Sequence, residues 1–440
     1  MALSAWLTVG LLATLLLMWT LVSRWAQSHG VTGPMVFLAG GVVLSAAAGV
    51  DLEPTQVRTL AELTLVVVLF HDASTVRVGS LRRDPGIALR LLLVGFPLAL
   101  VLAGATTALL LPGIGVAGVV LIAAAVTPTD AGLGAATILN PAVPVRVRRA
   151  LNVESGLNDG LATPVVLAAL AVLVGQTDPA RGVPSILDIG AVPALVGIGI
   201  GVGVGLVGAF VLDQSYARGL SSVVTRALAV LTLPVVALSL AELSNSNGFI
   251  TAFVTGITFG RASRCLESEP SAQEGVELLA DLLGFVMWVA AGGLVVGVFL
   301  QGFRWQWLVV AVAALTVIRF TAVAASLIGA GFRAPTVAFL AWFGPRGLAS
   351  IVFGLLALEE LGPSSDLVHD VTGVISLTVL LSVAAHGATA GPLARRYGAW
   401  AEASQAPIEM EPATEPMPSR GRGLTEGFPL HRARTDKESH

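Results

Sequence analysis

Residues 154–159 read ESGLND, two carboxylates and an amide within a stretch that is otherwise apolar. An ionisable side chain at bilayer depth costs about 2.5–3.5 kcal/mol or more, so such groups usually have a function. Glu154 lies four residues before Asn158. Ser155 likewise lies four residues before Asp159, so the four side chains share adjoining faces of one helical turn. Their oxygens suit a small dehydrated cation, a proton, or both in turn.

The composition is that of a membrane protein. Of the 440 residues, 55% are hydrophobic and 12% are charged, whereas a soluble domain carries about 25% charged residues. The single cysteine, Cys265, excludes a disulfide within the chain and a thiolate metal cluster. The sequence has no P-loop, no His/Cys cluster and no hydrolase triad, so we expect neither an enzyme, nor a cofactor, nor a nucleic-acid partner.

A helix needs roughly 20 apolar residues to cross a hydrocarbon core of about 30 Å. On this basis the fold class is an all-α integral membrane protein of about thirteen transmembrane helices. The predicted helices lie near 4–23, 33–50, 57–73, 87–111, 115–138, 150–175, 186–212, 223–243, 248–262, 278–301, 306–330, 335–359 and 370–391.

Arginines alternate between the predicted loops, from Arg24 to Arg395 and Arg396, while the intervening loops are acidic. Because cytoplasmic loops hold the arginines, this predicts an outer N-terminus and a cytoplasmic C-terminus in the plasma (inner) membrane. The transmembrane domain is expected to cover 1–394. The polar remainder, 395–440, is expected to be a short, disordered cytoplasmic tail.

Two predicted helices contain a proline that should break them, Pro128 in 115–138 and Pro345 in 335–359. Paired interruptions mark the midplane site of a transporter, so the two helices are expected to be the crossing middle elements of inverted repeats. An acidic side chain can offset exposed half-helix N-termini, and a basic one exposed C-termini. Asp130 and Arg346 fit those two roles.

Four motifs carry a family resemblance: PTDA at 128–131, NPAVPVR at 140–146, NVESGLNDG at 152–160 and GPRGLAS at 344–350. They resemble the NhaP-type branch of the monovalent cation/proton antiporters. The resemblance implies a homodimer and alternating access. In such a protein the core helices, about 87–175 and 306–391, move against the remaining dimerisation or scaffold helices.

The resemblance also implies roles for individual residues. Asp159 would be the carboxylate that binds Na⁺ (or K⁺) and H⁺ in turn. Glu154 would form a structural ion pair with Arg319, and an Asn-Asp motif is typical of electroneutral relatives. Further contacts to the ion would come from Asp130, Ser155, Asn158 and the backbone carbonyl of Thr129.

The sequence departs from the family pattern at two places. The family often has Thr-Asp-Pro in the first broken helix, whereas here Pro128 precedes the pair. A glutamate common near the end of the third helix is represented by His71 and Asp72. Asp72, together with His386 near the end of the last helix, is a candidate for the ion path.

The predicted function is therefore electroneutral 1:1 exchange of Na⁺, or Li⁺, for H⁺, with a role in pH regulation. Exchange of K⁺ for H⁺ is the alternative, because no sequence rule separates the two cations at such a site. A passive cation channel is a different class, and it would predict a continuous pore with a repeated filter in place of one asymmetric cluster.

Overall fold

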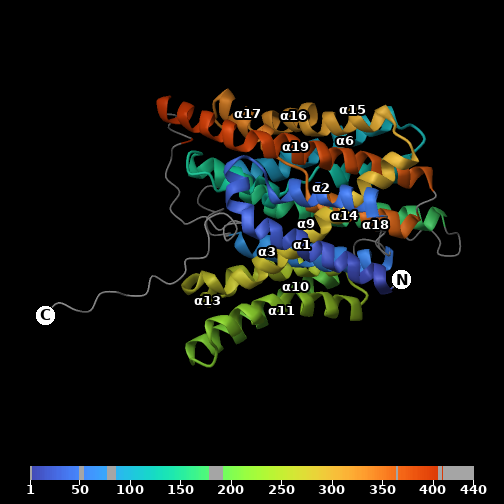
Figure 1. Ribbon diagram of the computed structural model, residues 1–440. Helices are drawn as coiled ribbons and strands as arrows, with labels where there is room; N and C mark the ends of the chain where they lie inside the picture. Colours follow the sequence, from blue (N-terminus) through green and yellow to red (C-terminus); the bar gives the residue numbers. More distant parts are fainter. Residues whose placement is uncertain are drawn as a thin grey trace.

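The computed structural model is all-helical throughout the part of the chain that it describes (Figure 1). Helix α1 begins at the end of the molecule opposite to the one where α19 ends, as the predicted topology requires. The described residues are 2–48, 54–76, 86–177, 192–362, 365–404 and 409.

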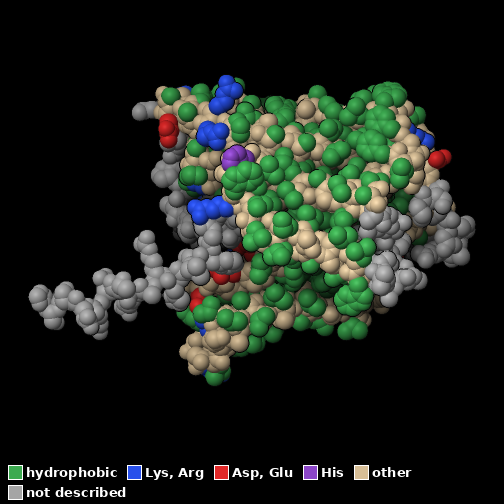
Figure 2. All heavy atoms as spheres, viewed as in Figure 1, with side chains coloured by type: hydrophobic (Ala, Val, Ile, Leu, Met, Phe, Trp, Pro, Cys, Tyr) green, Lys and Arg blue, Asp and Glu red, His purple; other side chains and the backbone are tan. Residues whose placement is uncertain are grey.

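Within the described residues, nine helices are long and apolar enough to cross a membrane. The other predicted spans correspond to α2, α3, α12 and the broken pair α17/α18. On the face shown in Figure 2, Arg, Asp and Glu side chains lie toward the two ends, with an uncharged belt between them. The all-helical membrane fold is thus confirmed, while the total of thirteen spans remains a prediction.

One group of helices, which we call the scaffold, packs through small residues. A Cβ at Gly256 of α12 would lie 2.4 Å from the Phe70 carbonyl oxygen of α3, and one at Gly41 of α2 would lie 2.1 Å from that of Val289. Glycine at such positions lets helix backbones approach closely in a membrane. The scaffold comprises α1 (Ala2–Ser28), α2 (Gly33–Ala48), α3 (Pro54–Thr75), α10 (Val192–Ala217), α11 (Val223–Leu243), α12 (Gly248–Ala262), α13 (Arg264–Ser268), the 3₁₀ turn η3 (Pro270–Gln273) and α14 (Glu274–Gln301).

The other group, which we call the core, has two parts with the same order of elements. Each part has a helix interrupted by a π-helical turn, then a broken helix, then a long helix, as inverted repeats require. Such π-turns often occur at functional sites. The first part comprises α5 (Gly86–Arg90), η1 (Leu91–Gly95), α6 (Phe96–Leu110), α7 (Gly115–Val126), α8 (Ala131–Ile138) and α9 (Val145–Thr177); the second comprises α15 (Trp305–Ala313), η4 (Ala314–Ile318), α16 (Arg319–Ser326), α17 (Ala334–Trp342), α18 (Leu348–Leu361) and α19 (Asp366–Ala403).

Both predicted helix breaks are confirmed. Helix α7 ends at Val126 and α8 begins at Ala131, while α17 ends at Trp342 and α18 begins at Leu348. Each gap contains the predicted proline. The two broken helices therefore present four half-helix ends inside the core.

The end of the last helix differs from the prediction. Helix α19 continues to Ala403, so residues 395–403 are helical and the tail does not start at 395. Ala394, Tyr397, Gly398 and Ala401 are buried with helical spacing. The prediction ended the helix where hydropathy falls, although the helical spacing of small and aromatic residues continues. The predicted start of the seventh span, at 186, lies outside the described residues.

Candidate functional site

The two helix breaks meet at Asp130. Its backbone N–H donates to the Pro345 carbonyl at 2.8 Å, which joins one break directly to the other. Its side chain accepts from the backbone N–H of Leu133 in α8 at 2.9 Å and from that of Leu348 in α18 at 2.6 Å. One buried carboxylate therefore caps the N-termini of two half-helices, where the helix dipoles favour a negative charge.

Arg346 lies at the C-terminal end of the half-helix α7, whereas Asp130 lies at the N-termini of α8 and α18. Its guanidinium donates to the carbonyl of Val126, the last residue of α7, at 2.8 Å and to that of Ala314 in η4 at 3.2 Å. It also donates to the Gly344 carbonyl. The Ser350 hydroxyl donates to the next-to-last carbonyl of α7, that of Ala125, at 2.6 Å. The second broken helix thus supplies hydrogen-bond donors to the unpaired carbonyls at the C-terminus of α7.

Two glycines make these contacts sterically possible. A Cβ at Gly347 would lie 2.2 Å from Oδ2 of Asp130, and a Cβ at Gly344 would lie 2.6 Å from Nε of Arg319. No side chain fits at such distances without displacing a buried charged group. Glycine at both positions of the second break is therefore a requirement of the site.

The predicted partners Glu154 and Arg319 lie together. Arg319 Nη2 donates to Glu154 Oε2 at 2.8 Å and Nη1 donates to Oε1, so the pair is bidentate. Both residues are almost fully buried, at 2% and 4% exposure. Arg319 Nη2 also donates to the Leu340 carbonyl at 3.3 Å near the end of α17. Because both carboxylate oxygens of Glu154 accept from the guanidinium of Arg319, this geometry fits a structural ion pair.

A cluster of neutral oxygens joins α9 to the first break. The hydroxyls of Thr129 and Ser155 are 2.8 Å apart, and Asn158 Nδ2 donates to Oγ1 of Thr129 at 2.8 Å. The Asn158 side-chain oxygen is buried and has no hydrogen-bond partner among the described residues. A buried acceptor left without a donor is costly, and it indicates a place for a proton donor or a cation. The threonine atom in this cluster is the hydroxyl, whereas the prediction concerned the backbone carbonyl.

Asp159 lies on α9 between two sets of contacts. Ser155 and Asn158 face the core through Thr129, while a Cβ at Gly160 would meet the ring of Phe253 in scaffold helix α12 at 2.5 Å. On a helix of 3.6 residues per turn, residue 159 falls between these faces. The residue is 6% exposed, and its position on α9 lies between the face toward the core and the face toward the scaffold.

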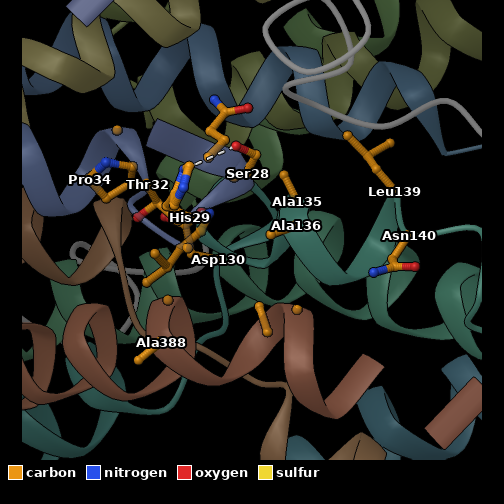
Figure 3. Close-up of a pocket in the computed structure, with 18 of the residues that line it drawn as sticks. Ser28, His29, Thr32, Pro34, Asp130, Ala135, Ala136, Leu139, Asn140 and Ala388 are labelled. Carbon is orange, nitrogen blue, oxygen red and sulfur yellow. Dashed lines mark hydrogen bonds between the residues drawn. The ribbon is translucent and has the colours of Figure 1, made fainter. Parts of the chain in front are cut away.

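A cavity of about 690 Å³ opens between core and scaffold on the side where α19 ends. Asp130 is in its wall, together with Ala135 and Ala136 of α8, Thr32 and Pro34 at the α1–α2 turn, and Ala388 of α19 (Figure 3). Asp159 is not among the lining residues. The cavity thus leads from one surface to the crossing of the broken helices.

The two remaining candidates lie elsewhere. Asp72 of α3 packs against α9, because a Cβ at Gly156 would contact its Cβ at 3.7 Å. His386 Nε2 lies 2.8 Å from the Trp342 carbonyl at the end of α17, and Nδ1 lies 3.2 Å from the Ser382 hydroxyl. Neither residue lines the cavity. His386 thereby ties the first half of the second broken helix to α19.

Sequence reasoning missed several residues that build the site. Ser382 of α19 accepts the backbone N–H of Arg346 at 2.7 Å, but a serine in an apolar helix carries no signal for that contact. The Ala314 carbonyl, which accepts from Arg346 at 3.2 Å, lies in the π-helical turn η4, and the sequence gives no indication of that turn. Ser350 lies within the GPRGLAS motif, four residues after Arg346. That spacing is the one feature of the sequence that indicates that the two side chains lie near each other.

An all-helical membrane protein with two crossed, broken helices and opposite charges at their ends belongs to the class of secondary transporters. The transmembrane sodium/hydrogen exchanger family matches residues 11–396, so the chain belongs to that family. Membership makes the protein a transporter with a cation and a proton as substrates, in agreement with the resemblance of its motifs.

Solved structures share the fold. The sodium proton antiporter MjNhaP1 from Methanocaldococcus jannaschii at pH 8 is 19% identical, with a TM-score of 0.68 over 90% of this chain and 99% of that chain. An electron-microscopy structure of MjNhaP1 is 20% identical, with a TM-score of 0.61 over 89% and 97% of the two chains. At these identities the likeness concerns the fold.

Proposed function

We propose that the protein exchanges Na⁺ for H⁺ at Asp159, with Thr129, Ser155 and Asn158 as neutral partners of the ion. The observation that carries the proposal is the unpartnered side-chain oxygen of Asn158, buried beside two hydroxyls and next in sequence to an acidic residue. Oxygen ligands with few formal charges suit a monovalent hard cation. The same carboxylate binds either the cation or the proton, so the two compete.

The contacts of the two neighbouring carboxylates support a 1:1 stoichiometry. Glu154 is neutralised by Arg319, and Asp130 is held by the N–H groups of two helix ends. In the proposed scheme Asp159, next to the Asn158 side-chain oxygen, is the one carboxylate that binds the cation and the proton in turn. One positive charge enters for each one that leaves, and the exchange is electroneutral.

Movement of the core against the scaffold would provide alternating access. The cavity separates the two groups at the end where α19 terminates, and the bare carboxylate is costly to carry through the closed state. Only the loaded carrier crosses, which enforces exchange. By the arginine distribution the cavity faces the cytoplasm of a plasma-membrane protein, with the scaffold as the homodimer interface.

Reconstituted liposomes with an acidic interior test the proposal. Addition of Na⁺ should release the internal acid, and an imposed membrane potential should leave the rate unchanged. Asp159→Asn should abolish exchange, because an amide cannot carry the alternating charge. Asp366→Asn is the matched control, since the Asp366 side chain is 96% exposed at the start of α19.

Each outcome assigns the protein to one class. Retained exchange in Asp159→Asn would refute the assignment of that carboxylate. Release of acid by K⁺ but not Na⁺ would identify the alternative, a K⁺/H⁺ antiporter. Cation flux without proton counterflow would indicate a channel, and no response to any monovalent cation would contradict antiport altogether.

A further inference from the structure

Arg58 of scaffold helix α3 reaches across to the core. Its guanidinium lies 2.8 Å from Glu359 Oε2 and 2.8 Å from Glu360 Oε1, both at the end of α18. It also lies 2.8 Å from Oε1 of Glu62, one turn along α3. A single cation is therefore shared by three carboxylates, two of which belong to the other group of helices.

This ion cluster lies at the end of the molecule opposite to the cavity. Helix α3 begins there and α18 ends there, whereas the cavity walls include the end of α8 and the last turns of α19. A recess of about 470 Å³ beside Arg58 is lined by Glu62, Glu242 and Glu360, and its lining includes neither Asp130 nor Asp159. Core and scaffold are thus joined by ion pairs at one end of the molecule and separated by the cavity at the other end.

We propose that Arg58 is a positioning residue that holds the transporter in the conformation open at the α19 end. The inference rests on the proposed alternating access, because Arg58 can pair with Glu359 and Glu360 only in one arrangement of core and scaffold. When the core moves, these pairs must separate. Without Arg58, the carboxylate of Glu62 faces those of α18 across the interface, and repulsion favours the opposite conformation.

The size of the effect follows from the exposure of the cluster. The side chain of Arg58 is 38% exposed and those of Glu359 and Glu360 are 22% and 26% exposed, so solvent screens each pair. We therefore expect Arg58→Gln to lower the ratio of the two conformations about three- to tenfold. From a roughly even starting ratio, the accessibility of the cavity then falls about two- to fivefold.

Thiol labelling measures that ratio directly. Cys265 is the single cysteine, so Cys265→Ala provides a background for Ala136→Cys, which places a thiol in the exposed core wall of the cavity. Vesicles with the α19 end outward are treated with a membrane-impermeant thiol reagent. Arg58→Gln should slow labelling by the stated factor.

A matched control is an ion pair within the core at the same end. Arg304, 41% exposed, donates to Asp370 of α19 at 2.9 Å. Arg304→Gln removes an arginine of similar exposure whose ion pair does not cross from core to scaffold, so labelling should be unchanged.

Swapping the charges of Arg58 and Glu359 by substitution tests the role of Arg58 most directly. Arg58→Glu should slow labelling more than Arg58→Gln, and Arg58→Glu with Glu359→Arg should restore it, because one cation again lies among three carboxylates. Equal labelling in all variants, or no restoration in the double variant, would overturn the role of Arg58. Labelling does not require transport. If the wild-type protein shows no Na⁺/H⁺ exchange in liposomes, the proposed function is refuted, whatever the labelling rates of the variants.

Discussion

Replacing Glu154 by glutamine should destabilise the protein without changing the chemistry of the ion site. The carboxylate is 2% exposed and accepts two hydrogen bonds from Arg319. Glutamine is nearly isosteric but neutral, so the guanidinium remains buried without a counter-charge. If Glu154 is structural, the loss should appear in stability and not in the apparent affinity for the cation.

The magnitude follows from the burial of the pair. Removing one partner of a buried ion pair costs about 3–5 kcal/mol, because the other charge is left uncompensated. Arg319 keeps a hydrogen bond to the Leu340 carbonyl, which favours the lower end of that range. For a chain of this length we expect the midpoint of thermal unfolding to fall by about 3–5 °C.

Thermal unfolding of the purified protein in detergent, together with exchange assays well below the midpoint, provides the measurement. Glu154→Leu with Arg319→Met removes both charges and should recover most of the stability lost in the single variant. An unchanged midpoint in Glu154→Gln, or a raised apparent KM for the cation with normal stability, would refute the structural role. The second result would make Glu154 a ligand.

Three further predictions concern the helix ends. Gly347→Ala should abolish transport and lower expression, because its Cβ would lie 2.2 Å from Oδ2 of Asp130, whereas Gly203→Ala, with open space around it, should be neutral in the same assays. Asp130→Asn should lower the unfolding midpoint by a few degrees, since an amide can accept at one helix N-terminus but presents N–H to the other; an unchanged midpoint and rate would contradict its capping role. Glu409→Ala should cost about 1.5–3 kcal/mol in unfolding experiments, because that buried carboxylate accepts from the Thr336 hydroxyl at 2.8 Å, and Glu409→Gln should lose less.

Much of the architecture could be predicted from the sequence. Hydropathy located the helices, and Pro128 and Pro345 located both breaks, because an interior proline removes a backbone donor and clashes with the preceding turn. The pairing of the two interruptions indicated a transporter. These features are local, and a single chain displays them directly.

Features that depend on contacts between distant segments could not be predicted. The two π-turns, at Leu91–Gly95 and Ala314–Ile318, have no distinctive composition. The burial of Glu409 beside Thr336 depends on packing at the start of α17, while the surrounding tail has the composition of a disordered segment. The placement of Asp159 between core and scaffold required the partners of neighbouring α9 residues on both sides.

The mutual capping of the two breaks has a consequence for biosynthesis. Asp130 precedes its partner Leu348 by 218 positions, and Val126 precedes Arg346 by 220. At about 5–20 residues per second, the ribosome needs roughly 10–45 s to supply those partners. During this interval the first break has unpaired backbone groups, each costing several kcal/mol in lipid. The nascent α7–α8 segment should therefore stay in the aqueous or protein surroundings of the insertion machinery until the second repeat has been made.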